Sequence, residues 1–223
     1  MTGNKHRILI ALSVVLAIQV LLTLIGGKLL FNSHEADMIH LSDMVLRMAS
    51  GAVAHMDFAT PIGGWAMLPM ALLMRAGLGL GEAMIWSQII VLLALFPALL
   101  WVALSRLTPG QSMAFGLAVA GLASGHVSGG TEPLLSFSMH YNRWCWAASL
   151  IVAAIALMPP KAGGEVADGA ATGLLMAAMA MVKVTFPLSL ALPVVFALLR
   201  SGRSRTLIVA LASALALLAA VTL

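Results

Sequence analysis

The run ILIALSVVLAIQVLLTLIGGKLL, residues 8–30, is followed directly by FNSHEADMIHLSD, residues 31–43. The first stretch is long enough to cross a bilayer as a helix, which takes about 20 apolar residues. The second collects two histidines and three carboxylates over a short distance. The change from one to the other predicts the point at which the chain leaves the membrane.

The composition of the whole chain agrees with an integral membrane protein. Hydrophobic residues make up 61% of the sequence and charged residues only 9%, whereas a soluble domain carries roughly 25% charged residues. Lys5 and Arg7 precede the first run, which is too long for a signal-peptide core and is expected to be retained. The single cysteine, Cys145, excludes an internal disulfide and a cysteine-based metal site. The net charge of +4 reflects loops and does not indicate nucleic acid binding.

Apolar segments recur along the whole length, and all of them are expected to be helical because lipid leaves an unpaired backbone without a partner. The segments are 8–31, 63–80, 83–104, 113–128, 144–159, 170–182, 185–199 and 206–223. The predicted fold is therefore an all-α, polytopic transmembrane bundle that forms one domain over residues 1–223. Because the chain stops inside an apolar run, we also expect it to be the N-terminal part of a larger protein.

The distribution of positive charge predicts seven crossings with a cytoplasmic N-terminus in a bacterial inner membrane. This layout holds if 63–80, which contains Pro69 and Arg75, lies on or half inside the membrane surface. If 63–80 crosses, Arg106 falls outside, and 170–199 has to form one long span. The preferred layout gives a first periplasmic loop over 32–82, with surface helices, and a second over 129–143.

The first loop carries a short amphipathic helix. Its apolar side is a stripe at helical spacing, formed by Met38, Leu41, Val45 and Met48. Asn32 can cap this helix and Glu35 can complete a capping box, while Asp37 can complement the helix dipole. Glu35 and Asp37 are also candidates for a catalytic base. A metal site from His34, Asp37 and His40 is disfavoured because these side chains do not converge on one face.

Further on, HMDFATPIGG, residues 55–64, predicts a turn that brings the chain back to the membrane. Asp57 either caps that turn or contacts a substrate, and His55 lies beside it.

The second loop and the apex at Lys183 gather further polar groups. The candidates in the second loop are Glu132, His140, Tyr141, Asn142 and Arg143. Arg143 and Lys183 either reach toward lipid phosphates or bind the phosphate of a substrate lipid. Trp144 and Trp146 are expected to be interfacial anchors.

The order of these features resembles the GT-C superfamily of membrane glycosyltransferases, which includes protein O-mannosyltransferases and aminoarabinose transferases. HEADMIHLSDMVLRMASGAVAHMDFATPIGG, residues 34–64, is similar to the family's first outer loop: an acid, an amphipathic helix, a glycine and a proline-containing turn. GTEPLLSF resembles the second loop, and TGLLMAAMAMVKVTF resembles a helix that ends in lysine. The usual Asp-Glu pair of the first loop reads His34-Glu35 here, so the first aspartate is missing.

The resemblance implies transfer of a sugar from a polyprenyl-phosphate-type donor to an acceptor at the periplasmic face. It implies a catalytic role for Glu35 or Asp37 as the base, supported by Glu132. Cationic groups hold the departing phosphate, and Arg143 and Lys183 are the candidates for them. The other predicted substrate contacts are Asp57, His55, His140, Tyr141 and Asn142. A divalent cation assists some members, and no residues here define a site for one.

Two other functional classes stay open. The missing aspartate also fits a non-catalytic subunit of a membrane complex that keeps a degenerate glycosyltransferase-like fold. Its partners would be other membrane subunits rather than a lipid-linked sugar donor. A transporter or flippase is disfavoured because the sequence shows no paired segments with broken helices.

Overall fold

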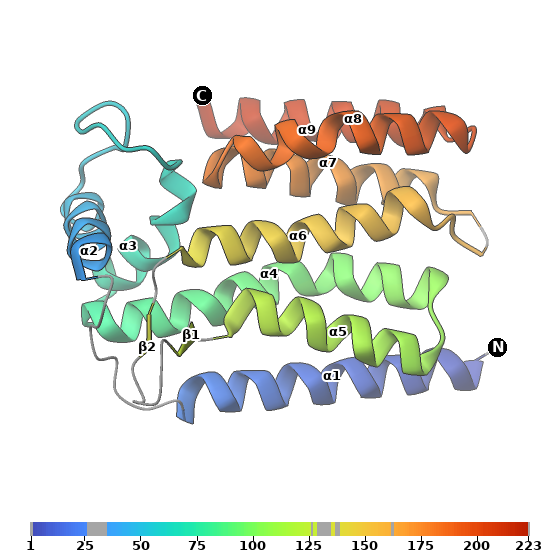
Figure 1. The fold of residues 1–223 in the computed structure, drawn as a ribbon, viewed down its shortest axis with the longest axis horizontal. Helices are drawn as coiled ribbons and strands as arrows, with labels where there is room; N and C mark the ends of the chain where they lie inside the picture. The colour runs from blue at the N-terminus through green and yellow to red at the C-terminus, as the bar shows by residue number, and fades with distance from the viewer. Residues whose placement is uncertain are drawn as a thin grey trace.

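The computed structural model describes residues 2–25, 35–125, 127–128, 135–136, 139–161 and 163–222. Seven long helices run along one common axis, as Figure 1 shows. They are α1 (Thr2–Ile25), α4 (Leu80–Arg106), α5 (Pro109–Ser124), α6 (His140–Leu157), α7 (Glu165–Val182), α8 (Thr185–Arg200) and α9 (Ser204–Thr222). The fold is predominantly helical, as predicted.

Four of these helices are long and apolar enough to cross a membrane, and the chain is accordingly a membrane protein. They cover Gly3–Ile25, Leu80–Arg106, Glu165–Val182 and Ser204–Val221. The helices α5 and α8 have 16 residues each, which gives a length of about 24 Å. Helix α6 begins with the polar sequence HYNR. Each of the seven predicted spans overlaps one bundle helix. Only four of these helices are long and apolar enough to cross a membrane, so seven crossings are not confirmed.

The segment 63–80 does not form a spanning helix. It folds into a short 3-10 turn, η1 (Gly64–Ala66), and the eight-residue helix α3 (Leu68–Arg75). A helix of this length covers about 12 Å, well short of the roughly 30 Å of a bilayer core. Pro69 lies in its first turn, where a missing N–H costs nothing. The position of this segment on or half inside the membrane surface stays a prediction.

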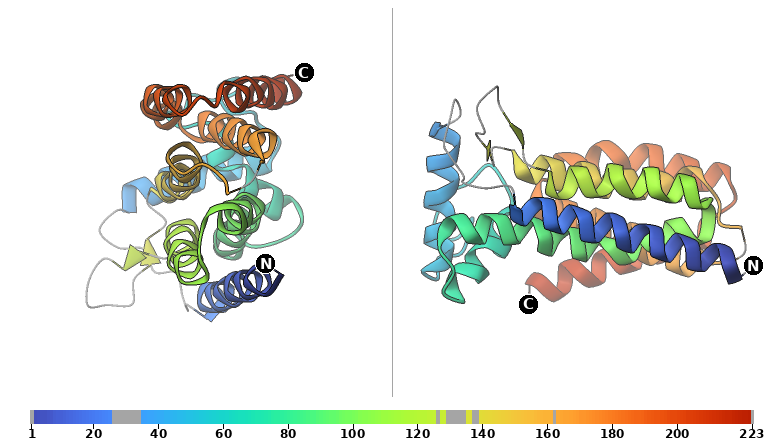
Figure 2. Two further views of the ribbon diagram at one scale, coloured as in Figure 1. Left: turned by 90° about the vertical axis from the view of Figure 1, so that its right-hand side faces the viewer. Right: turned by 90° about the horizontal axis from the view of Figure 1, so that it is seen from below.

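Helix α2 (Glu35–Ala49) lies across the ends of the bundle helices, as Figures 1 and 2 show. The predicted apolar stripe is buried beneath it: Met38, Leu41, Val45 and Met48. Arg75 donates hydrogen bonds to the last carbonyls of α2, at Met48 (2.5 Å) and Ala49 (3.2 Å). These bonds satisfy carbonyls that the helix itself leaves unpaired, so α3 fixes the end of α2.

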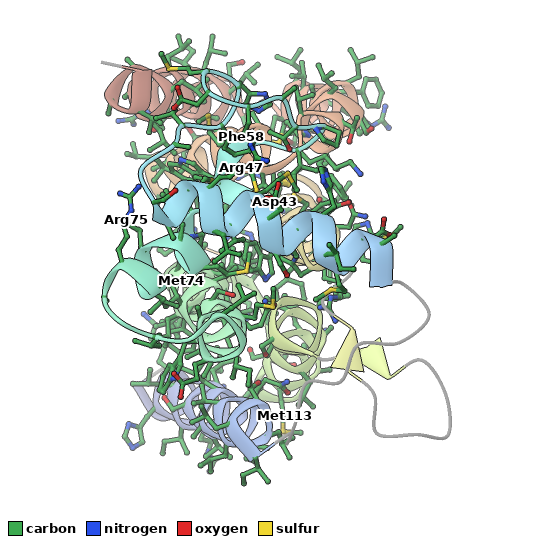
Figure 3. The ribbon with its side chains drawn as sticks, turned by 90° about the vertical axis from the view of Figure 1, so that its left-hand side faces the viewer. Asp43, Arg47, Phe58, Met74, Arg75 and Met113 are labelled. Carbon is green, nitrogen blue, oxygen red and sulfur yellow. The ribbon has the colours of Figure 1, made fainter. Side chains whose placement is uncertain are left out.

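The outer side of α2 faces away from the bundle. Asp43 and Arg47 form an exposed ion pair of 2.8 Å along it, and Figure 3 labels both residues on α2. We call the end of the bundle that α2 covers the α2 end. This end contains the last turns of α1, α5, α7 and α9 and the first turns of α4, α6 and α8.

A small strand pair lies within the α5–α6 connection, and no sequence pattern predicted it. Strand β1 (Val127–Ser128) pairs antiparallel with β2 (Leu135–Ser136).

Helices α7 and α9 pack with their backbones in close contact. A side chain at Gly173 would collide with the carbonyl oxygen of Ala210, and one at Gly169 would approach that of Thr206 to 2.6 Å. Two glycines four residues apart allow helices in lipid to approach in this way. This contact was not anticipated from the sequence.

The opposite end of the bundle, where the N-terminus lies, is closed by a buried ionic cluster. The carboxylate of Asp168, on α7, accepts hydrogen bonds from Arg106, Arg203 and the indole N–H of Trp101, the last at 2.7 Å. Arg106 also donates to the carbonyl of Met158 (2.6 Å), and Arg203 donates to that of Ile155 (2.7 Å). The cluster joins α4, α6, α7 and the start of α9. Arg106 and Arg203 are therefore buried inside the bundle.

Among the described side chains, cations are in excess at the end of the bundle opposite α2. The α2 end carries four acids, Asp37, Asp43, Asp57 and Glu82, and four cations, Arg47, Arg75, Arg143 and Lys183. The opposite end carries two acids, Glu165 and Asp168, and seven cations, Lys5, Arg7, Arg106, Lys161, Arg200, Arg203 and Arg205.

Candidate functional site

The predicted site residues that the structure brings together lie at the α2 end, around Lys183. This lysine occupies the two-residue turn between α7 and α8. Its ammonium donates a hydrogen bond to the side-chain oxygen of Asn142 (3.0 Å) and lies 5.2 Å from the centre of the Tyr141 ring. Lys183 and Asn142 are 41 positions apart in the sequence. The prediction that the second loop and the Lys183 apex share one side of the molecule is confirmed.

Asp37 completes this group from the first turn of α2. Burial first, and the nearby carboxylate of Asp37 second, raise the pKa of the Tyr141 hydroxyl above its usual value of 10.0. A negative charge close to a phenol disfavours the phenolate, which explains the direction of the second effect. Asp37 itself is exposed, so its carboxylate is open to a substrate hydroxyl. We call Asp37, Tyr141, Asn142 and Lys183 the Lys183 cluster.

A cavity of about 410 Å³ lies directly beneath the Lys183 cluster. Trp144 and Cys145 line it one turn along α6 from Tyr141, and Val182 lines it immediately before Lys183. The remaining lining residues are Trp65, Pro69, Ile90, Val91, Ala94, Leu95, Ala148, Leu174, Leu175, Ala178, Met179 and Leu217. The cavity therefore lies between α4, α6, α7 and α9, with η1 and α3 at its head. It offers an apolar site whose wall at Val182 continues directly into Lys183.

The side chain of His140 is buried and makes contacts that hold the fold together. Its ring is fully buried, and its Nε2 lies 2.8 Å from the carbonyl oxygen of Ala66. The ring packs edge-on against Tyr141 and Trp144, with centroids 5.4 Å and 4.6 Å away. His140 thus links η1 to α6 and holds Tyr141 in place. A direct role in substrate binding stays a prediction.

Arg143 is buried at the start of α6 and donates to the carbonyl of Gly125 at the end of α5. Its Nε and its second terminal nitrogen are buried without a hydrogen-bond partner among the described residues. Buried donors of this kind require an explanation, because each unpaired group costs free energy. An anion contact at Arg143, which is adjacent to Asn142 on α6, stays a prediction.

Asp57 closes a turn. Its carboxylate accepts a hydrogen bond from the backbone N–H of Val53 (2.7 Å), and its own N–H donates to the Val53 carbonyl (2.9 Å). His55, in the same turn, has a left-handed φ of 68° and is exposed. The turn role that the sequence offered for Asp57 is confirmed. The segment then reaches the Lys183 cluster, because the N–H of Gly63 bonds to the carbonyl of Val182 (2.9 Å).

Two of the predicted catalytic acids cannot be placed. Asn32 and Glu132 lie outside the described residues, and so does the side chain of Glu35, although its backbone begins α2. Among the residues that are described, no group of three metal-binding side chains occurs.

The anchor prediction for Trp144 is wrong. Its side chain is buried inside the bundle, and its indole N–H donates to the Gln88 side chain (2.8 Å). Trp146, which is 49% exposed, agrees with a position at the outer surface. The two residues lie on different faces of α6, and the sequence does not say which face is inward.

Sequence reasoning also missed the apolar cavity and the Lys183–Asn142 bond. A signal was present for the bond, since both residues flank apolar segments on the same predicted side. No comparable signal exists for the cavity, because its walls come from five separate parts of the chain.

No known protein family, curated protein or solved structure was found to match this chain. The fold and the site define it as a helical membrane protein with a polar cluster above an apolar cavity.

Proposed function

We propose that the chain is a membrane glycosyltransferase, or the membrane part of one, that transfers a sugar from a polyprenyl-phosphate-type donor to an acceptor hydroxyl. The reaction takes place at the α2 end, which faces the periplasm of a bacterial inner membrane. One observation carries this proposal: a 410 Å³ apolar cavity has Val182 in its wall, directly before Lys183, whose ammonium is held by Asn142.

The arrangement suits a lipid that carries a phosphate. The cavity accepts part of an apolar chain between α4, α6 and α7, where burial of apolar surface is favourable. The phosphate then lies beside Lys183, whose ammonium has three donors and uses one on Asn142. Tyr141 is protonated at neutral pH, as any phenol with a pKa of 10.0 or above is, so its hydroxyl can donate a hydrogen bond to substrate.

The residues supply a complete set of roles for the transfer. The acceptor hydroxyl oxygen attacks the anomeric carbon of the sugar and forms the new glycosidic bond. The bond between that carbon and the phosphate oxygen breaks, and the phosphate leaves with the electron pair. Asp37 takes the proton of the acceptor hydroxyl, and Lys183 stabilises the charge that develops on the leaving phosphate.

The test uses the full chain reconstituted in liposomes with a polyprenyl-phosphate-linked sugar and an acceptor. Asp37→Asn is expected to lower kcat by 10²- to 10⁴-fold, the usual contribution of a general base. Lys183→Met is expected to lower kcat by roughly 10²-fold or more, since it removes the charge opposite the leaving group.

Two matched variants serve as controls. Asp43→Asn removes an exposed carboxylate from the same helix, and Arg200→Gln removes an exposed cation from the opposite end. Both are expected to retain activity. Full activity in Asp37→Asn, together with Glu35→Gln and Glu132→Gln, overturns the mechanism. An inactive wild-type chain that purifies in fixed stoichiometry with other membrane proteins favours the non-catalytic subunit instead.

A further inference from the structure

A second hollow, of about 190 Å³, lies at the opposite end of the bundle. It is formed where the first turns of α1, the last turn of α4, the start of α5 and the α6–α7 connection meet. Its polar lining consists of Asn4, Lys5, Thr108 and Lys161, and its walls include the apolar side chains of Ile8 and Leu104. It is separate from the cavity below the Lys183 cluster.

Lys161 is held beside this hollow by two hydrogen bonds. Its backbone N–H donates to the carbonyl of Ser105 (3.0 Å), and its ammonium donates to that of Leu107 (3.3 Å). The ammonium therefore has two donors left for a ligand. The connection that carries Lys161 is further fixed to α4 by the bond from Arg106 to the Met158 carbonyl.

The positive charge of the hollow is uncompensated by its described lining, which contains two lysines and no carboxylate. Of the two acids in this part of the structure, Asp168 is engaged by Arg106, Arg203 and Trp101. The other, Glu165, lies in the first turn of α7. An anion in the hollow would thus meet two ammonium groups, one from α1 and one from the α6–α7 connection.

The hollow also lies where one candidate span begins and another ends. Lys5 is near the start of the candidate span Gly3–Ile25, and Leu104 is near the end of the candidate span Leu80–Arg106. A ligand here has its charged part among the lysines and its apolar part against Ile8 and Leu104. Basic hollows between spanning helices hold phosphate-bearing lipid headgroups in this way.

We infer that this hollow binds the phosphate of an anionic lipid headgroup, with Lys5 and Lys161 as the two cationic contacts. The inference is independent of the proposed transfer reaction, because none of its residues belongs to the Lys183 cluster.

The test measures binding to the delipidated full chain in a neutral detergent by native mass spectrometry. The added probes are phosphatidylglycerol, phosphatidylcholine and inorganic phosphate. Phosphatidylglycerol is expected to bind more tightly than phosphatidylcholine, which carries no net charge. The double variant Lys5→Gln/Lys161→Gln is expected to lose roughly 30-fold in affinity for phosphatidylglycerol, since each cation at an anionic surface contributes about fivefold.

The matched control is Arg200→Gln/Arg205→Gln, which removes the same charge from exposed positions at the same end of the bundle. It is expected to bind phosphatidylglycerol as the wild type does. An equal loss of phosphatidylglycerol affinity in both double variants overturns the inference. It would indicate a general electrostatic attraction to this end of the bundle rather than a binding site. Binding of inorganic phosphate as tight as that of phosphatidylglycerol identifies a free anion, and not a lipid, as the ligand and overturns the lipid assignment. Equal melting temperatures of the two variants without ligand show that a loss of binding is not a loss of folding.

Discussion

Tyr141 is the residue at which the charges of the Lys183 cluster can be measured directly. It is the only tyrosine of the chain, the carboxylate of Asp37 contributes to its raised pKa, and the ammonium of Lys183 lies 5.2 Å from its ring centre. Its ring is in turn held by the buried His140. One side chain therefore reports on three separate elements, α2, α6 and the α7–α8 turn.

We expect the ultraviolet absorbance of tyrosinate to titrate with a midpoint above 10.0 in the folded chain. The Asp37→Asn variant should lower this midpoint, because a neutral amide no longer disfavours the phenolate. The folded chain holds this proton more tightly than the unfolded chain. The associated stability is therefore present below pH 10 and is lost as the pH rises through the pKa of the folded state.

The control for this titration is Asp43→Asn, which removes a carboxylate from the same helix. Its titration midpoint should equal that of the wild type. An unchanged midpoint in Asp37→Asn would mean that Asp37 does not lie near Tyr141.

At the scale of elements, two contacts hold α7 and α9, one to the rest of the bundle and one to each other. One is the ionic cluster around Asp168, and the other is the close packing of α7 on α9. Both act at buried positions, where a substitution leaves an unpaired charge or a steric conflict rather than a solvated side chain.

For the ionic cluster, Asp168→Ala leaves two buried guanidinium groups without their carboxylate. Removal of one partner from a buried ionic group costs about 3–5 kcal/mol. We expect a loss of stability of that size in denaturant-induced unfolding in detergent. Asp43→Ala, in the exposed pair with Arg47, should change stability by less than about 1 kcal/mol. Similar effects of the two substitutions would contradict the buried cluster.

For the helix contact, Gly173→Ala introduces a methyl group against the Ala210 backbone. Overpacking of this kind costs about 1–3 kcal/mol, even though alanine favours a helix more than glycine does. Gly121→Ala, in α5, meets no atom within 4 Å and should be neutral or stabilising. Thermal unfolding of both variants in one detergent measures the difference. A Gly173→Ala variant as stable as Gly121→Ala would exclude the close α7–α9 contact.

At the scale of the whole molecule, the uneven distribution of charge is the organising feature. Acids of the first loop gather at the α2 end, and most cations gather at the other end. The two hollows follow the same division, with the larger one below the Lys183 cluster and the basic one beside Lys5 and Lys161. The two proposed sites are thus separated by the length of the bundle.

Local patterns in the sequence determined much of this arrangement. Apolar length determined the bundle helices, and helical periodicity determined the buried face of α2 with Met38, Leu41, Val45 and Met48. The turn at Asp57 was predictable because its hydrogen bonds join residues that are close in the sequence. These features depend on neighbouring residues, so a linear pattern is sufficient to predict them.

Tertiary structure decided how helices face one another, and the candidate site depends on that. Only the fold brings Lys183 to Asn142, turns Trp144 inward to Gln88, and places Asp168 between two arginines. In an apolar helix nearly every face is hydrophobic, so periodicity does not identify the face that packs inward. That choice is made by close contacts such as Gly173 against Ala210 and by pairing of buried charges, and both require residues from distant parts of the chain.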